Sequence, residues 1–331
     1  MLAVHNLTKR YKKVTAVDDL SFAIEPGRVT GFLGPNGSGK STTMRCILGL
    51  DNPTSGSTSI YGRLYKDLPS PLTTVGALLD QKAFHPKRTP LQHLQILATL
   101  YGFPKKRVDE VLEMTGITSV AKKRIGGFSL GMSQRLGIAT ALLGDPKVLL
   151  FDEPVNGLDP EGVRWVRELC QHLASDGRTV FISSHLMSEM AQTAQDIVII
   201  GKGRLIAQGP ISDFVNAEQN TLVQLMSPKV SETEELLTSS GFTYTAQRSD
   251  SDPYPTFIIR SNDAPALGQL MFNRNLPIYH LSTTHRSLED IFMSFTSSAV
   301  DYRSGIKTTE PGYQPLAPSN TNPFPPQGGQ A

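Results

Sequence analysis

The sequence predicts an α/β domain that carries a helical insert, followed by a small α+β domain of the ferredoxin-like type. In residues 1–210, short all-apolar segments alternate with helical patterns, and a helical stretch over about 86–143 interrupts them. Over 217–300 the pattern changes to strand, helix, strand, strand, helix and strand. A chain of 331 residues is also too long for one ordinary core, which favours two domains.

Composition and charge are those of an ordinary globular chain. Hydrophobic residues make up 39% and charged residues 19%, and 32 basic side chains balance 30 acidic ones, so we expect no nucleic-acid partner. Cys46 and Cys170 fall in helical patterns and are expected to be buried free thiols. No apolar stretch approaches the ~20 residues that span a bilayer, and the first residues lack a signal-peptide core. If the protein acts at a membrane, we expect a separate chain to cross it.

The first domain is expected to centre on a sheet that is covered on both faces. Several short segments are apolar on all sides, which is typical of strands buried from both directions. These segments are Val29–Leu33, Thr74–Leu79, Lys147–Asp152 and Thr179–Ser184. The stretch Asp196–Gly209 is typical of a hairpin that turns at Gly201–Gly203.

The insert is expected to hold two amphipathic helices. Thr89 suits an N-cap and Pro90 suits the first helical position, after which apolar residues recur at helical spacing as far as Tyr101. A second helix is expected over Arg107–Gly116.

The second domain and the tail differ in character from the first domain. A last helix is expected over Ser287–Phe295, where Ser287 and Asp290 have the spacing of a capping box. Residues 303–331 are rich in Pro, Gly, Asn and Gln and are expected to be disordered. This tail is either a solvated end or a short docking segment.

A glycine-rich loop follows the first apolar strand and precedes a helix. Gly34, Gly39, Lys40 and Ser41 match the pattern G-x-x-x-x-G-K-[ST], in the strand–loop–helix context that a phosphate-binding loop needs. Glycines let backbone N–H groups converge on phosphate oxygens, Lys40 reaches the outer phosphates, and the Ser41 hydroxyl ligates Mg²⁺. The predicted nucleotide-binding residues are Gly34, Pro35, Asn36, Gly37, Ser38, Gly39, Lys40, Ser41 and Thr42.

Two adjacent carboxylates end another apolar strand. Asp152 is placed to hold Mg²⁺ through water, and Glu153 to position or polarise the attacking water. Two such carboxylates beside a triphosphate repel each other unless a cation is present. The alternative is an acidic pair that only caps the next turn.

Further motifs follow in the order seen in one large family. The stretch 128–160 places a Ser-x-Gly helix start ahead of the acidic strand, and residues 1–210 resemble the nucleotide-binding domain of ABC transporters, a P-loop NTPase fold. The resemblance implies that ATP is the nucleotide. It assigns Tyr11 to adenine stacking, Gln81 to the Q-loop, Ser129 and Gly131 to the signature, Asp159 to the D-loop and His185 to the switch histidine.

Three of these residues have simpler interpretations. Tyr11 could be an ordinary surface tyrosine, and Gln81, which the resemblance places near Mg²⁺ or water, could be a polar residue after a strand. His185, which the resemblance places at the γ-phosphate, could be a histidine with a structural partner at a strand end.

The signature departs from the family pattern. Leu-Ser-Gly-Gly-Gln is common there, whereas this chain has Phe128, Ser129, Leu130, Gly131 and Met132. The leucine and methionine put side-chain contacts with nucleotide in doubt, but Ser129 as N-cap still leaves free N–H groups for an anion. This variant and the C-terminal domain resemble the ABC-2 type and multidrug or antibiotic resistance exporters.

The chain has only one copy of each motif, which bears on how a complete ATP site could form. In the family, each ATP lies between the loop of one subunit and the signature helix of another, so we expect a head-to-tail homodimer. The resemblance also implies a separate transmembrane permease, which would hold this chain at the cytoplasmic face of the membrane. We expect the segment Lys82–Pro90 of this chain to be the region that couples it to the permease. The expected activity is ATP hydrolysis that drives export of a drug, antibiotic or lipid-like cargo.

Two other classes remain open at this stage. Soluble ABC ATPases that act on ribosomes usually have two tandem cassettes, whereas this chain has one. Members that act on DNA have a long coiled coil, for which the stretch between Gln81 and Ser129 leaves no room. A P-loop kinase or GTPase needs neither a signature helix nor His185.

Overall fold

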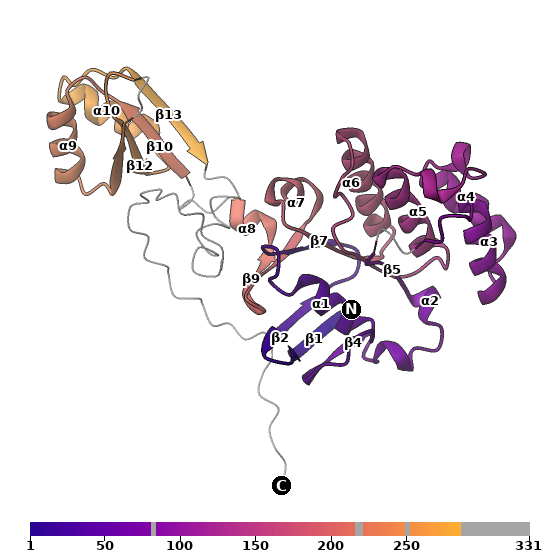
Figure 1. The fold of residues 1–331 in the computed structure, drawn as a ribbon. Helices are drawn as coiled ribbons and strands as arrows, with labels where there is room; N and C mark the ends of the chain where they lie inside the picture. Colours follow the sequence, from indigo (N-terminus) through magenta and orange to yellow (C-terminus); the bar gives the residue numbers. More distant parts are fainter. Residues whose placement is uncertain (81–83, 216–220, 249–251, 286–331) are drawn as a thin grey trace, which may run out of the picture.

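The computed structural model describes most of the chain (Figure 1). The described residues are 1–80, 84–215, 221–248 and 252–285. Gln81, the helix expected over Ser287–Phe295 and the tail over 303–331 lie outside the described residues. Among the described residues, no helix is long and apolar enough to cross a bilayer.

A six-stranded sheet forms the centre of the first domain. Its strand order is β5-β6-β7-β3-β8-β9, and all neighbours are parallel except the hairpin of β8 and β9. The predicted strands and hairpin are therefore confirmed. The strands are β3 (Val29–Leu33), β5 (Val75–Leu78), β6 (Val148–Phe151), β7 (Thr179–Ser184), β8 (Asp196–Gly201) and β9 (Arg204–Pro210).

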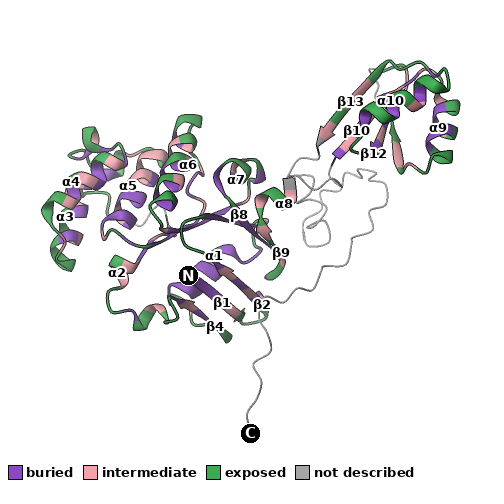
Figure 2. Cartoon of the chain, turned by 180° about the vertical axis from the view of Figure 1, so that it is seen from behind, coloured by how far each residue is buried: buried purple, intermediate pink, exposed green. Residues whose placement is uncertain are grey.

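Successive side chains of the central strands enter two different cores. In β6, Leu149 and Phe151 pack with helices on one face, whereas Val148 and Leu150 pack on the other face. Burial on both sides explains why these strands are rich in apolar residues, and Figure 2 shows them buried. The first face is covered by α5 (Leu130–Leu142), α6 (Pro160–Ser175) and α7 (Met187–Thr193).

The second face is covered by one helix and a sheet that the sequence analysis missed. An antiparallel sheet of order β2-β1-β4 packs there together with α1. Its strands contain polar residues and register shifts, which hide the simple alternation of a strand pattern. The elements are α1 (Lys40–Ile47), β1 (Leu2–Tyr11), β2 (Val14–Ile24) and β4 (Ser55–Ile60). Cys46 in α1 and Cys170 in α6 are buried free thiols, as expected.

The insert is helical, as predicted. The Thr89 hydroxyl accepts the Gln92 N–H at 3.2 Å, and the Gln92 side-chain oxygen accepts the Thr89 N–H at 3.1 Å, which completes a capping box. Together α3, α4 and α5 gather at the β5 end of the sheet (Figure 1). The elements between β4 and α5 are η1 (Tyr65–Asp67), α2 (Pro71–Thr74), α3 (Pro90–Tyr101), α4 (Lys105–Met114), η2 (Thr118–Val120) and η3 (Ile125–Gly127).

The C-terminal elements form a ferredoxin-like unit with a core of its own. The strand order is β11-β12-β10-β13 with antiparallel pairing throughout, and α9 and α10 contribute to the core of the unit. The elements are β10 (Thr221–Met226), α9 (Val230–Ser239), β11 (Tyr244–Gln247), β12 (Thr256–Arg260), α10 (Ala264–Asn273) and β13 (His280–His285), and α8 (Ile211–Val215) precedes them. The domain limits 1–210 and 217–300 stay predictions.

Candidate active site

The loop, the acidic pair and the strand-end histidine meet at one edge of the six-stranded sheet. Because β3, β6 and β7 are parallel and in register, their carboxyl ends lie side by side. Gly34, Asp152 and His185 each directly follow one of these strands. Ligands of open α/β sheets bind beyond this edge, so the arrangement places all three motifs around one candidate site.

The glycine-rich loop has a backbone that only glycine adopts easily. Gly37 and Gly39 have φ of 81° and 106°, and a Cβ on Gly39 would meet the Ala16 carbonyl oxygen at 2.5 Å. The Ser38 N–H donates to the Pro35 carbonyl at 3.1 Å and tightens the turn. Because α1 begins directly after Gly39, its first N–H groups have no intrahelical acceptor and are available to an anion.

Lys40 is buried within the loop. Its Nζ donates to the carbonyl oxygens of Gly34 at 2.6 Å and Pro35 at 3.3 Å, and it lies 3.5 Å from Glu153 Oε1. Burial lowers the pKa of Lys40, and the nearby Glu153 carboxylate opposes this effect. The ammonium group is therefore directed at the inner surface of the loop, whereas the next residue, Ser41, is exposed.

The Glu153 carboxylate joins the loop lysine to the strand-end histidine. Glu153 Oε2 lies 2.8 Å from His185 Nδ1, while Oε1 faces Lys40. Glu153 has φ of 49°, in the left-handed region that costs a non-glycine residue about 1–2 kcal/mol. This unusual backbone turns the side chain of Glu153 away from the course of β6 and toward the loop.

Ser183 holds both members of the acidic pair, and the sequence analysis missed it. The Ser183 hydroxyl donates to Asp152 Oδ1 and accepts the Glu153 N–H at 2.9 Å. Ser183 is fully buried in β7. A hydroxyl in a strand that is expected to be buried on both faces was the available signal, because a buried polar group needs a partner. Gln134 of α5 adds a further contact, since its Nε2 donates to the Glu153 carbonyl at 3.3 Å.

The signature and D-loop residues lie at helix starts of the same chain. The Ser129 hydroxyl caps α5 by accepting the Met132 N–H at 3.2 Å, and Asp159 Oδ1 caps α6 by accepting the Gly162 N–H at 2.9 Å. A Cβ on Gly131 would meet Leu158 at 3.2 Å, so the two helix starts are in contact. Both caps leave backbone N–H groups at exposed ends.

Tyr11 lies at the end of β1, close to the end of the loop. Its hydroxyl donates to Asp51 Oδ2 at 2.6 Å, and Lys9 Nζ lies 4.7 Å from the ring centroid. The hydrogen bond to Asp51 raises the pKa of Tyr11, while the Thr42 side chain acts in the opposite direction. Tyr11 is 42% exposed, so it offers an anchored aromatic surface beside the loop.

Comparison with known proteins agrees with this arrangement. Residues 17–156 match the family described as ABC transporter. The uncharacterized ABC transporter ATP-binding protein YhcH of Bacillus subtilis (strain 168) is 35% identical over 299 residues, which cover 89% of this chain and 96% of YhcH. The chain belongs to the ABC transporter ATP-binding proteins. Members of this family are ATPases, and the described fold and motifs are those of an ABC ATPase.

Other members of the family share a smaller part of the chain. The bacitracin transport ATP-binding protein BcrA of Bacillus licheniformis is 42% identical over 234 residues, which cover 67% of this chain and 76% of BcrA. A structure described as the dimeric structure of MJ0796, a bacterial ABC transporter cassette, is 26% identical with a TM-score of 0.59. It covers 64% of this ABC ATPase and 99% of the MJ0796 chain.

Proposed function

We propose that this chain is the ATP-hydrolysing subunit of an ABC exporter, in which two copies close head to tail on ATP and Mg²⁺ and act on a separate membrane permease. The observation that carries the proposal is the linked set of Lys40, Glu153 and His185 at the carboxyl edge of the sheet. It joins a phosphate-binding group to a carboxylate base and an imidazole within one hydrogen-bonded unit.

The nucleotide fits the loop for reasons of shape and charge. A side chain at Gly34 would collide with Ser38 and with the Ile200 carbonyl, so the bare backbone is required there. Lys40 and the N–H groups at the start of α1 supply positive charge to the phosphates. Tyr11, anchored by Asp51, offers its ring to the adenine base.

The oxygen atoms at the site also fit Mg²⁺. Ser41 is exposed at the start of α1, and the Asp152 carboxylate is oriented by Ser183 at the end of β6. Mg²⁺ prefers oxygen ligands and keeps several waters, so one hydroxyl and one carboxylate suit it. When bound, the ion neutralises charge on the phosphate oxygens. Glu153 is then the group that orients the attacking water and accepts its proton, and His185 holds the Glu153 side chain in place.

Dimer formation explains the exposed signature helix start. Ser129 uses its hydroxyl to cap α5, which leaves an anion site at the surface of the chain. In the proposed dimer, the second copy supplies this end of α5, with Gly131 and Asp159, to the nucleotide held by the first. ATP then links the two copies, and hydrolysis releases them.

A cavity between the insert and the sheet is the proposed docking site for the permease. It has a volume of about 550 Å³ and is lined mainly by apolar side chains of β5, α3 and α5. Phe84, which belongs to the predicted coupling region, and His93 line it, and His93 Nε2 is buried without a hydrogen-bond partner among the described residues. A permease segment with an apolar side chain and a hydrogen-bonding group suits this cavity. Docking there holds the chain at the cytoplasmic face of the membrane.

The cargo is proposed from the relatives. BcrA of Bacillus licheniformis is named as a bacitracin transport protein and SrtF of Streptococcus pyogenes as a lantibiotic transport protein. We extend to this chain a cargo of the antibiotic or lipid-like class.

The decisive experiment measures specific ATPase activity against protein concentration. A composite site formed by two copies requires activity per chain to fall on dilution below the dimer dissociation constant. A Ser129→Trp variant, which blocks the start of α5, is expected to lose turnover but keep ATP binding. Activity per chain that stays constant at all dilutions would contradict the dimeric site.

A further inference from the structure

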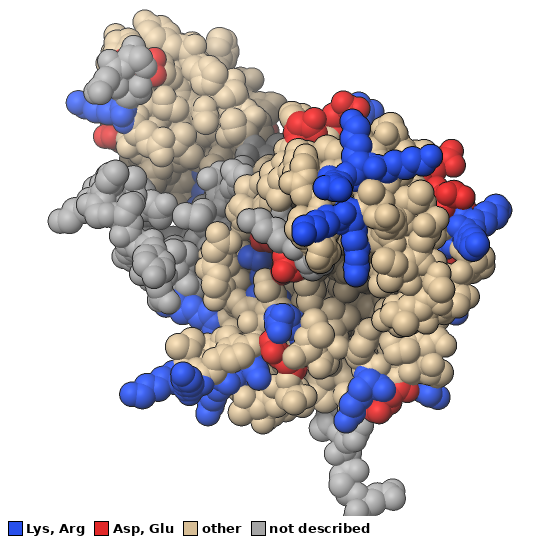
Figure 3. Space-filling model, turned by 45° about the vertical axis from the view of Figure 1, so that its right-hand side comes forward, with Lys and Arg blue, Asp and Glu red and all other residues tan. Residues whose placement is uncertain are grey.

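A group of cations gathers on the outer surface of the insert. The segments 86–91 and 121–126 run beside each other through three backbone hydrogen bonds, Leu91 N–H to Ala121 O, Ile125 N–H to Arg88 O and Gly126 N–H to Pro86 O. Figure 3, which brings the insert forward, shows Lys and Arg side chains projecting there. The exposed cations of the two segments, here called the basic patch, are Lys87, Arg88, Lys122, Lys123 and Arg124.

The five cations of the basic patch form no ion pair with an acidic side chain among the described residues. The ion pairs among the described residues involve other cations of the chain, such as Lys106 and Arg107 with Glu110 on α4. Cations that lie close together repel one another, so their grouping costs free energy unless an anion is present. The patch is therefore suited to a surface that carries negative charge.

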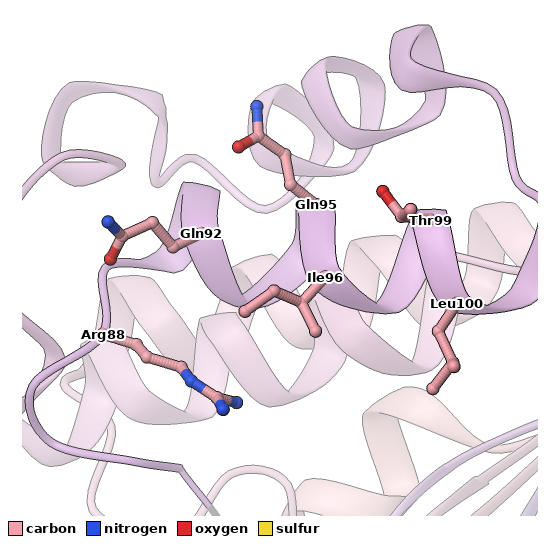
Figure 4. A pocket seen from close by; sticks show the side chains of 6 residues that line it. All are labelled: Arg88, Gln92, Gln95, Ile96, Thr99 and Leu100. Atoms are coloured by element: carbon pink, nitrogen blue, oxygen red, sulfur yellow. The ribbon is translucent and has the colours of Figure 1, made fainter.

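Exposed apolar side chains continue the basic patch along α3. One face of the helix is buried through Leu94 and Ala98, whereas Ile96 is 46% and Leu100 67% exposed on the opposite face. Arg88, Ile96 and Leu100 extend to the same side of α3 and line a shallow hollow of about 640 Å³ (Figure 4). Gln92, Gln95 and Thr99 complete the lining.

We infer that the basic patch and the outer face of α3 form a contact surface for a membrane with anionic lipid headgroups. Cations beside exposed aliphatic side chains on a helix are the features that bind an interfacial layer, with charge at the headgroups and apolar groups below them. Nucleic acid suits the surface less well. Proteins that bind single strands usually stack the bases on aromatic side chains, whereas the exposed apolar residues of this surface, Ile96 and Leu100, are aliphatic. The contact extends the proposed function, which places the chain at a membrane, but needs no permease.

The test is co-sedimentation of the full-length chain with vesicles of phosphatidylcholine, with and without phosphatidylglycerol. We expect binding only to the anionic vesicles, and weaker binding at high salt. The variant Lys122→Gln/Lys123→Gln/Arg124→Gln is expected to bind on the order of a hundredfold more weakly, since each cation contributes several-fold. The matched control, Lys105→Gln/Lys106→Gln/Lys147→Gln, has the same net charge and is expected to bind like the native chain.

A second variant tests the apolar part of the surface. Ile96→Ser/Leu100→Ser is expected to weaken vesicle binding several-fold while leaving its salt dependence unchanged, because the cations remain. ATPase activity of all these variants in solution is expected to match the native chain. A failure of vesicle binding is thereby distinguished from a failure of the proposed ATPase function.

Several outcomes overturn the inference. Equal vesicle binding by the patch variant and the native chain, or equal binding to neutral and anionic vesicles, removes the basic patch from lipid contact. Binding of poly-glutamate without binding of vesicles makes the patch a docking surface for an acidic protein segment. Tighter binding of single-stranded RNA than of anionic vesicles makes it a nucleic-acid surface.

Discussion

His185 Nδ1 lies 2.8 Å from Glu153 Oε2, so the residue after β7 holds the residue after β6. The other oxygen of the same carboxylate faces Lys40 of the loop. One side chain thus connects three segments that are far apart in the sequence. Its orientation depends on all of them, which makes Glu153 the centre of the candidate active site.

Replacing Glu153 by glutamine is expected to stop hydrolysis and spare ATP binding. The amide keeps the size of the side chain but cannot accept a proton, and loss of a general base costs about 10² to 10⁴ in rate. Light scattering should show an ATP-dependent dimer that persists, because hydrolysis releases the two copies in the proposed mechanism. The control is Glu161→Gln, an exposed acid at the start of α6. Native turnover in Glu153→Gln removes this residue from the catalytic role.

Lys40→Ala is expected to weaken nucleotide binding and turnover together. A hydrogen bond to a charged group contributes about 1.5–3 kcal/mol, so the dissociation constant of ATP should rise by about 10- to 100-fold. Titration with a fluorescent ATP analogue measures this change. Lys66→Ala, which removes an exposed lysine, is the control. Unchanged ATP affinity in the Lys40 variant contradicts the assignment of the loop.

Ser183 is expected to act as a positioning residue through its hydroxyl. Comparison of Ser183→Thr with Ser183→Val isolates the hydroxyl, because the two side chains have the same shape. The valine variant should lose about 10- to 100-fold in kcat and need more Mg²⁺ for half-maximal rate, with ATP affinity unchanged. The threonine variant, which keeps the hydroxyl, should retain a kcat and a Mg²⁺ requirement close to those of the native chain.

A neighbouring serine provides a control for this prediction. Ser184 is equally buried, but its hydroxyl accepts the Leu186 N–H at 2.9 Å, away from the acidic pair. Ser184→Ala is expected to leave the Mg²⁺ dependence of the rate unchanged. The same Mg²⁺ dependence in the valine and threonine variants of Ser183 shows that its hydroxyl has no positioning role.

The environment of the Asp51 carboxylate leads us to expect that the fold becomes less stable as pH falls. Hydrogen bonds from Arg45 and from Tyr11 lower the pKa of Asp51. A group with a lowered pKa in the folded state stabilises the fold above its unfolded pKa, and this contribution is lost as pH falls through the folded value. Asp51→Asn should therefore lose less thermal stability than the native chain between neutral pH and about pH 3. Parallel melting curves for the two chains over this range contradict the prediction.

The elements that sequence patterns predicted well are those whose signals are local. The strands around Leu149 and Val180 are buried on both faces, so each is recognised from its own apolar residues. Thr89 and Gln92 form the capping box within one turn of helix. The antiparallel sheet of β1, β2 and β4 was missed, because its strands are partly polar and irregular in register.

The sequence alone determined the strand–loop–helix context of the glycine-rich loop, the helix caps at Thr89 and Ser129 and the ferredoxin-like order of the second unit, because their signals lie in short stretches of sequence. The tertiary structure decided that Ser183 orients the acidic pair, and that the segments carrying Arg88 and Lys122 lie side by side. These contacts depend on the parallel register of the sheet and on loop pairing in the insert. Neither is encoded in the spacing of residues along the chain, because such contacts form only when distant segments pack together.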